Sequence, residues 1–336
     1  MRYLINILFL LRFTLMAFQA NRENGRFHRR VKRKASAVIL QSRKLNDGTV
    51  SERAFLKMQW YMVSTLFMSE LIAILAGHKI SQEEEGAFCL LGALIGLSDI
   101  LVDDYHLEGP RIEALLLNPG AENSAIEKIF GLYYQALLTE LDTDKAARLK
   151  EGLLALVHFQ IASLRQFDAR LSEQETEAIT RGKGGASLRL CAALFPALEE
   201  PLQGAIYRLG GLIQFLNDAQ DLPRDARDGV TTFIRFRENF QDAARFLGAE
   251  RRATFEAFMA PTLAHWRRHY FLFCFHAMYV LILYKLSHYA HVCSNRLDLE
   301  QIAGMPKEAF RVNPFSPGFV WASFGWIINF RPKAAE

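Results

Sequence analysis

The segment from Asn217 to Gly229 places a dense set of polar groups directly behind the apolar run Leu209–Leu216. It contains one asparagine, four aspartates and two arginines within thirteen residues. Residues four apart lie about 40° apart around an α-helix, so Asn217, Asp221 and Asp225 would form one ridge of oxygen atoms. Oxygen ligands suit a hard divalent cation such as Mg²⁺. The segment therefore predicts a helix whose end binds a metal ion.

A second apolar run, Ala87–Leu97, also ends in acidic residues. Asp99 and Asp103 are four residues apart and would share one helix face, and Asp104 could reach the same ion from its edge. The two acidic clusters are more than 100 residues apart in the sequence. Such a pair is what a metal site with two sides requires, provided that the two helix ends face each other.

Helical spacing of apolar residues dominates the chain. It extends over residues 52–76, 124–141, 146–171, 231–247, 251–270 and 271–284, and Ser81-x-x-Glu84 has the form of a capping box that starts a helix. The most apolar of these segments, Phe271–Tyr284, is short and carries His276, so it predicts a buried core helix. No strand alternation of any length is detectable. These patterns predict an all-α fold.

The composition provides ample material for a core. Apolar residues make up 51% of the 336 residues, and no linker rich in Pro, Gly or Ser separates two halves. We expect a helical domain over residues 46–295, preceded by an apolar helix and a basic segment at 1–45 and followed by an aromatic extension at 296–336. The four cysteines lack metal-type spacing and predict buried free thiols in a reducing compartment, the cytoplasm.

The N-terminal stretch Tyr3–Ala20 is apolar apart from Arg12, and residues 22–44 carry nine basic residues against Glu23 alone. A signal peptide fits this stretch worst, because no clear cleavage site follows. We favour a helix at a membrane surface, with its cationic continuation near lipid phosphates. Packing on the body of the protein is the alternative. The basic stretch lacks a nucleic-acid-binding motif, so no nucleic-acid partner is expected.

The segment Thr180–Ser187 combines three glycines with Arg181 and Lys183. Glycines let the backbone approach an anion closely, and the two cations would add charge. A plain turn or a kinked helix is the more common meaning of such a cluster.

Over residues 55–290 the chain resembles the isoprenoid (class I terpenoid) synthases. Asp99-Ile100-Leu101-Val102-Asp103-Asp104 resembles their aspartate-rich first motif, above all that of squalene and phytoene synthases. Asn217-x3-Asp221-x3-Asp225 has the spacing of their second metal motif. Asp228-Gly229-Val230-Thr231-Thr232 is similar to the segment that follows the second motif in prenyl diphosphate synthases.

The chain also departs from the family at three positions. Val102 stands where squalene-synthase-like chains often carry an acid. The paired arginines that follow the first motif in chain-elongating synthases are absent, and only Arg111 lies nearby. Pro223 lies inside the second motif and is expected to kink its helix, so Asp225 is the least secure of the three ligands.

The resemblance implies one large antiparallel helix bundle around a central apolar cavity, with both motifs at its mouth. It implies three Mg²⁺ ions and a prenyl diphosphate substrate. Peripheral membrane contact is expected from the N-terminal stretch instead, and the aromatic C-terminal extension needs a partner surface, which is the body of the protein, a membrane interface or a second subunit of a homodimer. The expected activity is that of a terpene synthase, a carbon–oxygen lyase that ionises a linear prenyl diphosphate and releases diphosphate. A squalene/phytoene synthase-like head-to-head prenyltransferase and a non-catalytic isoprenoid-binding protein at the membrane are the alternatives. The expected metal ligands are Asp99, Asp103, Asp104, Asn217, Asp221 and Asp225, of which Asp99, Asp103, Asn217 and Asp221 are essential to catalysis, and the expected diphosphate-binding residues are Arg181, Lys183, Arg224 and Arg227.

Overall fold

The computed structural model describes the whole chain except residues 1, 119, 197, 261, 314–316 and 332–336. The described residues form α-helices and short 3₁₀ helices without a strand, apart from one isolated bridge between Asn239 and Arg296. The predicted all-α class is therefore confirmed. In order, the elements are α1 (Arg2–Asn21), α2 (Arg26–Leu45), α3 (Glu52–Ala76), α4 (Gln82–Asp103), α5 (Gly109–Leu117), α6 (Ala125–Thr139), α7 (Thr143–Ser163), η1 (Leu164–Phe167), α8 (Glu173–Ala192), α9 (Glu200–Asp228), η2 (Phe233–Phe236), α10 (Phe240–Ala257), α11 (His265–Val292), α12 (Leu299–Gly304), η3 (Lys307–Phe310) and α13 (Pro317–Ile328).

The chain divides into two compact units, each with its own core. Unit 1 comprises Met1–Thr14, Arg165–Gly185 and Glu199–Glu336, and unit 2 comprises Leu15–Leu164 and Ala186–Leu198. The division predicted from the sequence, into segments 1–45, 46–295 and 296–336, stays a prediction. The single helix bundle around a central apolar cavity also stays a prediction.

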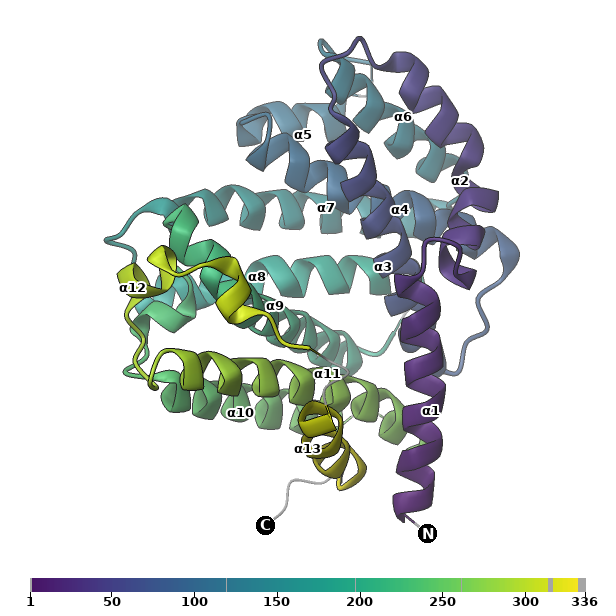
Figure 1. The fold of residues 1–336 in the computed structure, drawn as a ribbon. Helices are drawn as coiled ribbons and strands as arrows, with labels where there is room; N and C mark the ends of the chain where they lie inside the picture. Colours follow the sequence, from purple (N-terminus) through teal and green to yellow (C-terminus); the bar gives the residue numbers. More distant parts are fainter. Residues whose placement is uncertain (1, 119, 197, 261, 314–316, 332–336) are drawn as a thin grey trace. The chain divides into compact units, whose positions relative to one another are not determined.

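Helix α4 forms the centre of unit 2. Every residue from Ala87 to Val102 is buried, and α2, α3, α6 and α7 pack around the helix (Figure 1). Its start follows the predicted capping box. The Ser81 hydroxyl accepts from the Glu84 amide at 3.1 Å, and the Glu84 carboxylate accepts from the Ser81 amide at 2.8 Å. The sequence thus fixes where this helix begins, and its burial leaves the acidic end at the rim of the core.

Unit 1 is built on α9, α10 and α11, which contact one another (Figure 1). Phe215 of α9, Phe233 of η2 and Phe246 of α10 meet with ring centroids 4.9 to 5.2 Å apart. Residues Tyr270–Ala277 of α11 are all buried. The predicted core helix at Phe271–Tyr284 is therefore confirmed as part of α11, but its last turn is not in the core, since Leu281 is exposed and residues 282–284 are half-buried.

Three predicted helices have different boundaries in the structure. The helix predicted over 146–171 ends earlier, because α7 ends at Ser163 and only the short helix η1 follows it. The segment predicted as one helix over 251–270 is divided, because α10 ends at Ala257 and α11 begins at His265. Within 231–247, the short helix η2 comes first and α10 begins at Phe240. Asn239 starts α10, since its side chain accepts from the Asp242 amide at 2.9 Å and caps the helix. All four cysteines are buried and free, as predicted.

Four described helices are long and apolar enough to cross a membrane, namely α1, α3, α4 and α11. The apolar windows of α3, α4 and α11 are 56%, 89% and 61% buried inside the protein, whereas that of α1 is only 11% buried. Protein contacts therefore account for the apolar character of three of these helices, and α1 differs from them.

Candidate functional site

The first acidic motif lies at the C-terminal end of α4 in unit 2. Asp99, one turn before the helix end, is buried, whereas Asp103 and Asp104 are exposed. One carboxylate therefore lies at the edge of the core and two lie in solvent.

Two side chains of α3 contact the buried carboxylate of this motif. The Lys57 ammonium lies 2.8 Å from Asp99 Oδ2 and 3.8 Å from Asp104 Oδ2. The Tyr61 hydroxyl donates to Asp99 Oδ2 at 3.4 Å, and burial together with the charges of Asp99 and Asp103 raises the pKa of Tyr61, so it stays a donor. Sequence reasoning missed both residues. A signal was present, because Lys57 and Glu70 are the only charged residues of α3 beyond its first turn.

A third neighbour of Asp99 comes from α7. The Gln160 side chain is buried, and with its amide oriented to satisfy both partners it donates to the Ser98 carbonyl and accepts from the Asp99 amide, each at 3.2 Å. These bonds fix the backbone of α4 at the motif. Helices α3 and α7 thus both position Asp99.

Two glycines of α4 allow α3 to approach this closely. A Cβ atom at Gly92 would lie 2.6 Å from the backbone of Met62, and one at Gly96 would lie 2.9 Å from the Tyr61 ring. Glycine at these positions therefore sets the distance between α3 and the acidic end of α4.

Gly92→Ala is expected to lower the free energy of unfolding by about 1–3 kcal/mol, because the added methyl group must displace the backbone of α3. Gly86→Ala in the same helix is the matched control. No atom lies within 4 Å of the position of its Cβ, so alanine should stabilise the helix by up to about 1 kcal/mol. Urea denaturation measures both effects, and equal stability of the two variants would contradict the close packing of α3 on α4.

The second motif lies on α9 in unit 1. Asn217 is exposed, Asp221 is half-buried and Asp225 is buried. Helix α9 continues from Glu200 to Asp228 across Pro223, so the expected kink does not end the helix before Asp225. The Arg224 guanidinium lies 2.8 Å from Asp221 Oδ2 and 3.3 Å from Asp225 Oδ1.

Burial raises the pKa of two carboxyl groups on α9. The pKa of Asp225 rises to about 6, since burial and the charges of Asp221 and Asp228 outweigh Arg224. The pKa of Asp218 rises to about 7, although its carboxylate accepts from Gln214 Nε2 at 3.0 Å and Thr180 Oγ1 at 3.3 Å. Burial therefore disfavours the ionised form of both acids, and a bound cation would favour it.

Helix α11 contributes two residues near this motif that sequence reasoning also missed. The Tyr289 hydroxyl donates to the Gln220 carbonyl at 3.0 Å. Burial lowers the pKa of Lys285, and the charge of Asp221 opposes that shift. A lysine and a tyrosine four residues apart on one helix thus lie near each motif. They are Lys57 and Tyr61 at the first motif and Lys285 and Tyr289 at the second.

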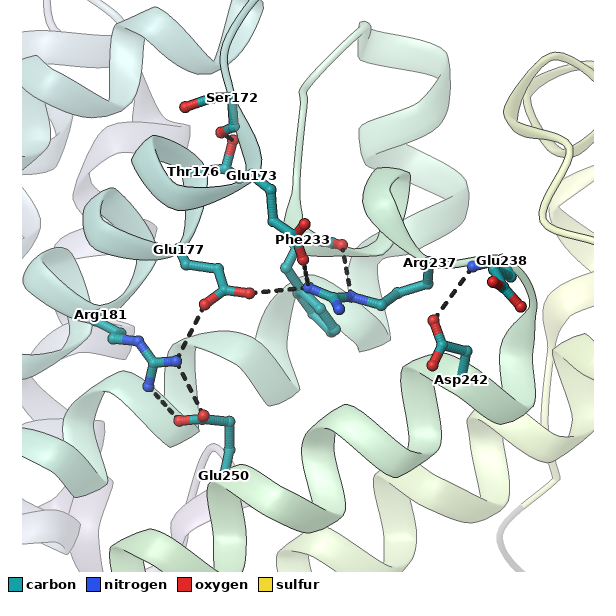
Figure 2. Close-up of polar contacts among 10 residues, drawn as sticks. All are labelled: Ser172, Glu173, Thr176, Glu177, Arg181, Phe233, Arg237, Glu238, Asp242 and Glu250. Atoms are coloured by element: carbon teal, nitrogen blue, oxygen red, sulfur yellow. Dashed lines mark hydrogen bonds and ion pairs between the residues drawn. The ribbon is translucent and has the colours of Figure 1, made fainter.

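The cations predicted to bind diphosphate have different surroundings. Figure 2 shows Arg181 of α8 between two acids: its Nη2 donates to Glu250 at 2.9 Å and to Glu177 at 3.2 Å. Its guanidinium also lies 5.0 Å from the centre of the Phe215 ring. Arg181 is therefore engaged in contacts within unit 1. The charge of Lys183, on the same helix, opposes the rise in the pKa of Asp218 that burial causes.

Glycines in this part of α8 serve helix packing. A Cβ at Gly184 would lie 2.1 Å from the Gly210 carbonyl oxygen of α9, and one at Gly210 would lie 2.2 Å from the Gly184 carbonyl oxygen. The segment 180–187 is helical, so it is not the turn weighed as an alternative. The contact brings Thr180 and Lys183 to the side of α9 that carries Asp218.

The remaining two predicted cations lie within the last turns of α9. Arg224 holds Asp221 and Asp225, as described above. Arg227 is half-buried, and its Nη1 atom is buried without a hydrogen-bond partner among the described residues. An unpartnered guanidinium N–H is costly in isolation and is a ready donor for an anionic oxygen.

The donor chemistry of both motifs fits Mg²⁺, because every expected ligand offers a carboxylate or amide oxygen. Within the part of the chain that the structure describes, no group of three or more His, Cys, Asp and Glu side chains is arranged to hold a metal ion. The two motifs belong to different units, and their joint action on one metal cluster stays a prediction.

Comparison with known proteins gives limited likeness. No family model and no curated protein matches the chain. The fold is similar to an isoprenoid synthase family member from Thermotoga neapolitana DSM 4359, with 12% identity and a TM-score of 0.42 over 71% of this chain and 96% of that one. It is also similar to a geranyltransferase from Legionella pneumophila, with 13% identity and a TM-score of 0.44 over 80% of this chain and 98% of that one. Likeness of this extent assigns no chemistry to the chain.

Proposed function

We propose that this chain is a Mg²⁺-dependent enzyme that releases diphosphate from a linear prenyl diphosphate. The observation that carries the proposal is the pair of acidic helix ends, each with a cation of its own unit at its carboxylates. Lys57 lies at Asp99 and Asp104, and Arg224 lies at Asp221 and Asp225. Without metal, these carboxylates pair with the side chains of Lys57 and Arg224. When Mg²⁺ and an anionic substrate bind, the metal can take the place of these side chains at the carboxylates.

Asp99, Asp103 and Asp104 would hold metal in unit 2, and Asn217, Asp221 and Asp225 would hold metal in unit 1. When bound, Mg²⁺ supplies the positive charge that stabilises a departing diphosphate. Lys57 and Arg224 hold the acids in place in its absence.

Three cations of unit 1 would bind the diphosphate oxygens. Arg227 offers a guanidinium N–H that has no partner among the residues the structure describes. Lys183 lies on the α8 face that carries Thr180, and Arg224 can turn from its acids to the anion. Arg181 contributes less directly, because Glu177 and Glu250 already accept from it. Positive charge placed where negative charge develops is the main source of rate acceleration in such a step.

The finer activity that we propose is that of a terpene cyclase. The absence of paired arginines after the first motif disfavours chain elongation, and Val102 departs from the squalene-synthase pattern. Head-to-head condensation of two prenyl diphosphates is the second candidate, favoured by the Asn, Asp, Asp identity of the second motif.

The purified full-length chain, incubated with linear prenyl diphosphates of increasing length, tests the proposal. We expect diphosphate release that requires Mg²⁺ and stops on chelation, with products that keep the carbon number of the substrate. Products with a doubled carbon skeleton would contradict cyclisation and would show that the enzyme condenses two prenyl diphosphates head to head. Binding of a prenyl diphosphate without release at any chain length would contradict the enzyme and favour an isoprenoid-binding protein.

A further inference from the structure

Helix α1 presents an unbroken apolar ridge to solvent. Leu4, Leu8, Leu11, Leu15 and Phe18 follow one another at intervals of four and three residues, and each is 55% to 63% exposed. This spacing places the five side chains on one helix face over about 21 Å. We call these five residues the leucine ridge. Figure 1 shows the helix that carries it.

The other side of α1 is committed to the protein. The Asn6 side-chain amide is fully buried and donates to the carbonyls of Ile328 at 2.8 Å and Phe330 at 3.1 Å. The Arg12 guanidinium lies 4.7 Å from the centre of the Tyr270 ring. A helix surrounded by lipid would have to give up these contacts, so the part of α1 that belongs to unit 1, up to Thr14, is built to lie on the protein with Leu4, Leu8 and Leu11 uncovered.

Helix α13 of unit 1 carries exposed tryptophans. Trp321 is 80% and Trp326 is 62% exposed, and α13 contains no charged residue. A hydrogen bond to α11 holds α13 in position, because His276 Nε2 donates to the Trp326 carbonyl at 3.2 Å. Tryptophan favours the boundary between lipid tails and water, where its ring is buried and its N–H stays wet.

After the leucine ridge, the sequence continues in unit 2 with basic residues. Gly25 begins α2 in a tight bend, since a Cβ there would lie 1.9 Å from the Gln19 carbonyl oxygen. Part of the basic stretch is neutralised inside the unit, with Arg30 paired to Glu70 and Glu85. Arg22, Arg29 and Lys32 are exposed, and no ion pair among the described residues involves them.

We propose that the leucine ridge and the α13 tryptophans dock on an anionic lipid bilayer, with α1 lying at its surface. The ridge provides apolar area along α1, and the tryptophans of unit 1 suit the headgroup boundary. Arg22, whose backbone amide donates to the carbonyl of Phe18 at the end of the ridge, suits lipid phosphates. A second copy of the chain is a poorer occupant, because it would bring a second Arg22, which forms no ion pair among the described residues, to the same ridge. This inference is independent of the proposed enzymatic activity.

Co-sedimentation of the full-length chain with vesicles tests the proposal. We expect binding to phosphatidylcholine vesicles that contain about 30% phosphatidylglycerol, and weaker binding without the anionic lipid or at high salt. The variant Leu4→Gln/Leu8→Gln/Leu11→Gln should bind at least about tenfold more weakly. The matched control Leu40→Gln/Leu117→Gln/Leu281→Gln removes three exposed leucines elsewhere and should bind like the wild type.

Circular dichroism shows whether both triple variants keep the helical content and thermal transition of the wild type. Trp321→Ser/Trp326→Ser should weaken binding as well, which gives a second route if the leucine variant does not fold. Equal binding by the leucine and control variants would overturn the proposal. So would dimerisation that the leucine variant abolishes in a chain that fails to bind vesicles, because the ridge would then be a contact between copies.

Discussion

Asn217→Ala is expected to slow Mg²⁺-dependent diphosphate release by about 10²- to 10³-fold while changing the free energy of unfolding by less than about 0.5 kcal/mol. The Asn217 side chain is exposed on α9, so its removal leaves no cavity and no buried unpaired group. If it is a ligand, its amide oxygen acts only on the metal-bound substrate. A large kinetic effect without a stability effect is therefore the signature of a site residue here.

Asp103→Ala should behave in the same way, because Asp103 is exposed at the end of α4. The double variant Asn217→Ala/Asp103→Ala tests whether the two motifs act on the same substrate, since the two residues belong to different units. Groups that act together on one substrate show strongly non-additive losses. The double variant should thus be little slower than either single variant.

Asp144→Ala and Asn21→Ala are matched controls, because both remove an exposed side chain of the same type from other helices. Neither should change diphosphate release. Full activity of Asn217→Ala or Asp103→Ala would exclude that residue from the site. Strictly multiplicative losses in the double variant would mean that the two motifs act separately.

The elements that the sequence predicts well are those set by local patterns. The capping box at Ser81 and Glu84 fixes the start of α4, and the apolar run from Ala87 to Val102 is buried in full. The acidic ridge of α9 follows from the helical period alone. Burial of the four thiols follows from their apolar neighbours in the sequence.

Partners that come from other helices could not be predicted in this way. Lys57 reaches Asp99 from a position forty-two residues earlier, and only the packing of α3 on Gly92 and Gly96 brings them together. Similarly, Arg181 has the placement of a diphosphate-binding cation, yet its acid partner Glu250 lies sixty-nine residues away. Side-chain pairing of this kind depends on the tertiary structure, which local spacing does not contain.

The ion-pair network in Figure 2 leads to the largest expected stability effect in unit 1. Arg237 Nη2 donates to Glu177 at 2.9 Å and also to Glu173, and its Nε donates to the Phe233 carbonyl at 3.3 Å. The Arg237 side chain is only 12% exposed and its guanidinium lies 4.3 Å from the centre of the Phe246 ring. One guanidinium therefore ties α8 to η2 and α10.

Arg237→Ala is expected to lower the free energy of unfolding by about 2–4 kcal/mol, because it leaves Glu177 and the Phe233 carbonyl short of donors and opens space beside Phe246. Arg245→Ala is the control: its pair with Asp242 spans 3.4 Å and Arg245 is 73% exposed, so the loss should stay below about 1 kcal/mol. Arg237→Lys should recover only part of the stability, since one ammonium cannot reproduce the fork of the guanidinium.

Urea denaturation of the three variants measures the differences in the free energy of unfolding. The difference for Arg237→Ala should persist at high salt, where exposed pairs are screened more than buried ones. A loss in Arg237→Ala no larger than that in Arg245→Ala would mean that the network adds nothing to the docking of α8, and that Arg181, held by the same Glu177, is freer to bind diphosphate than its contacts indicate.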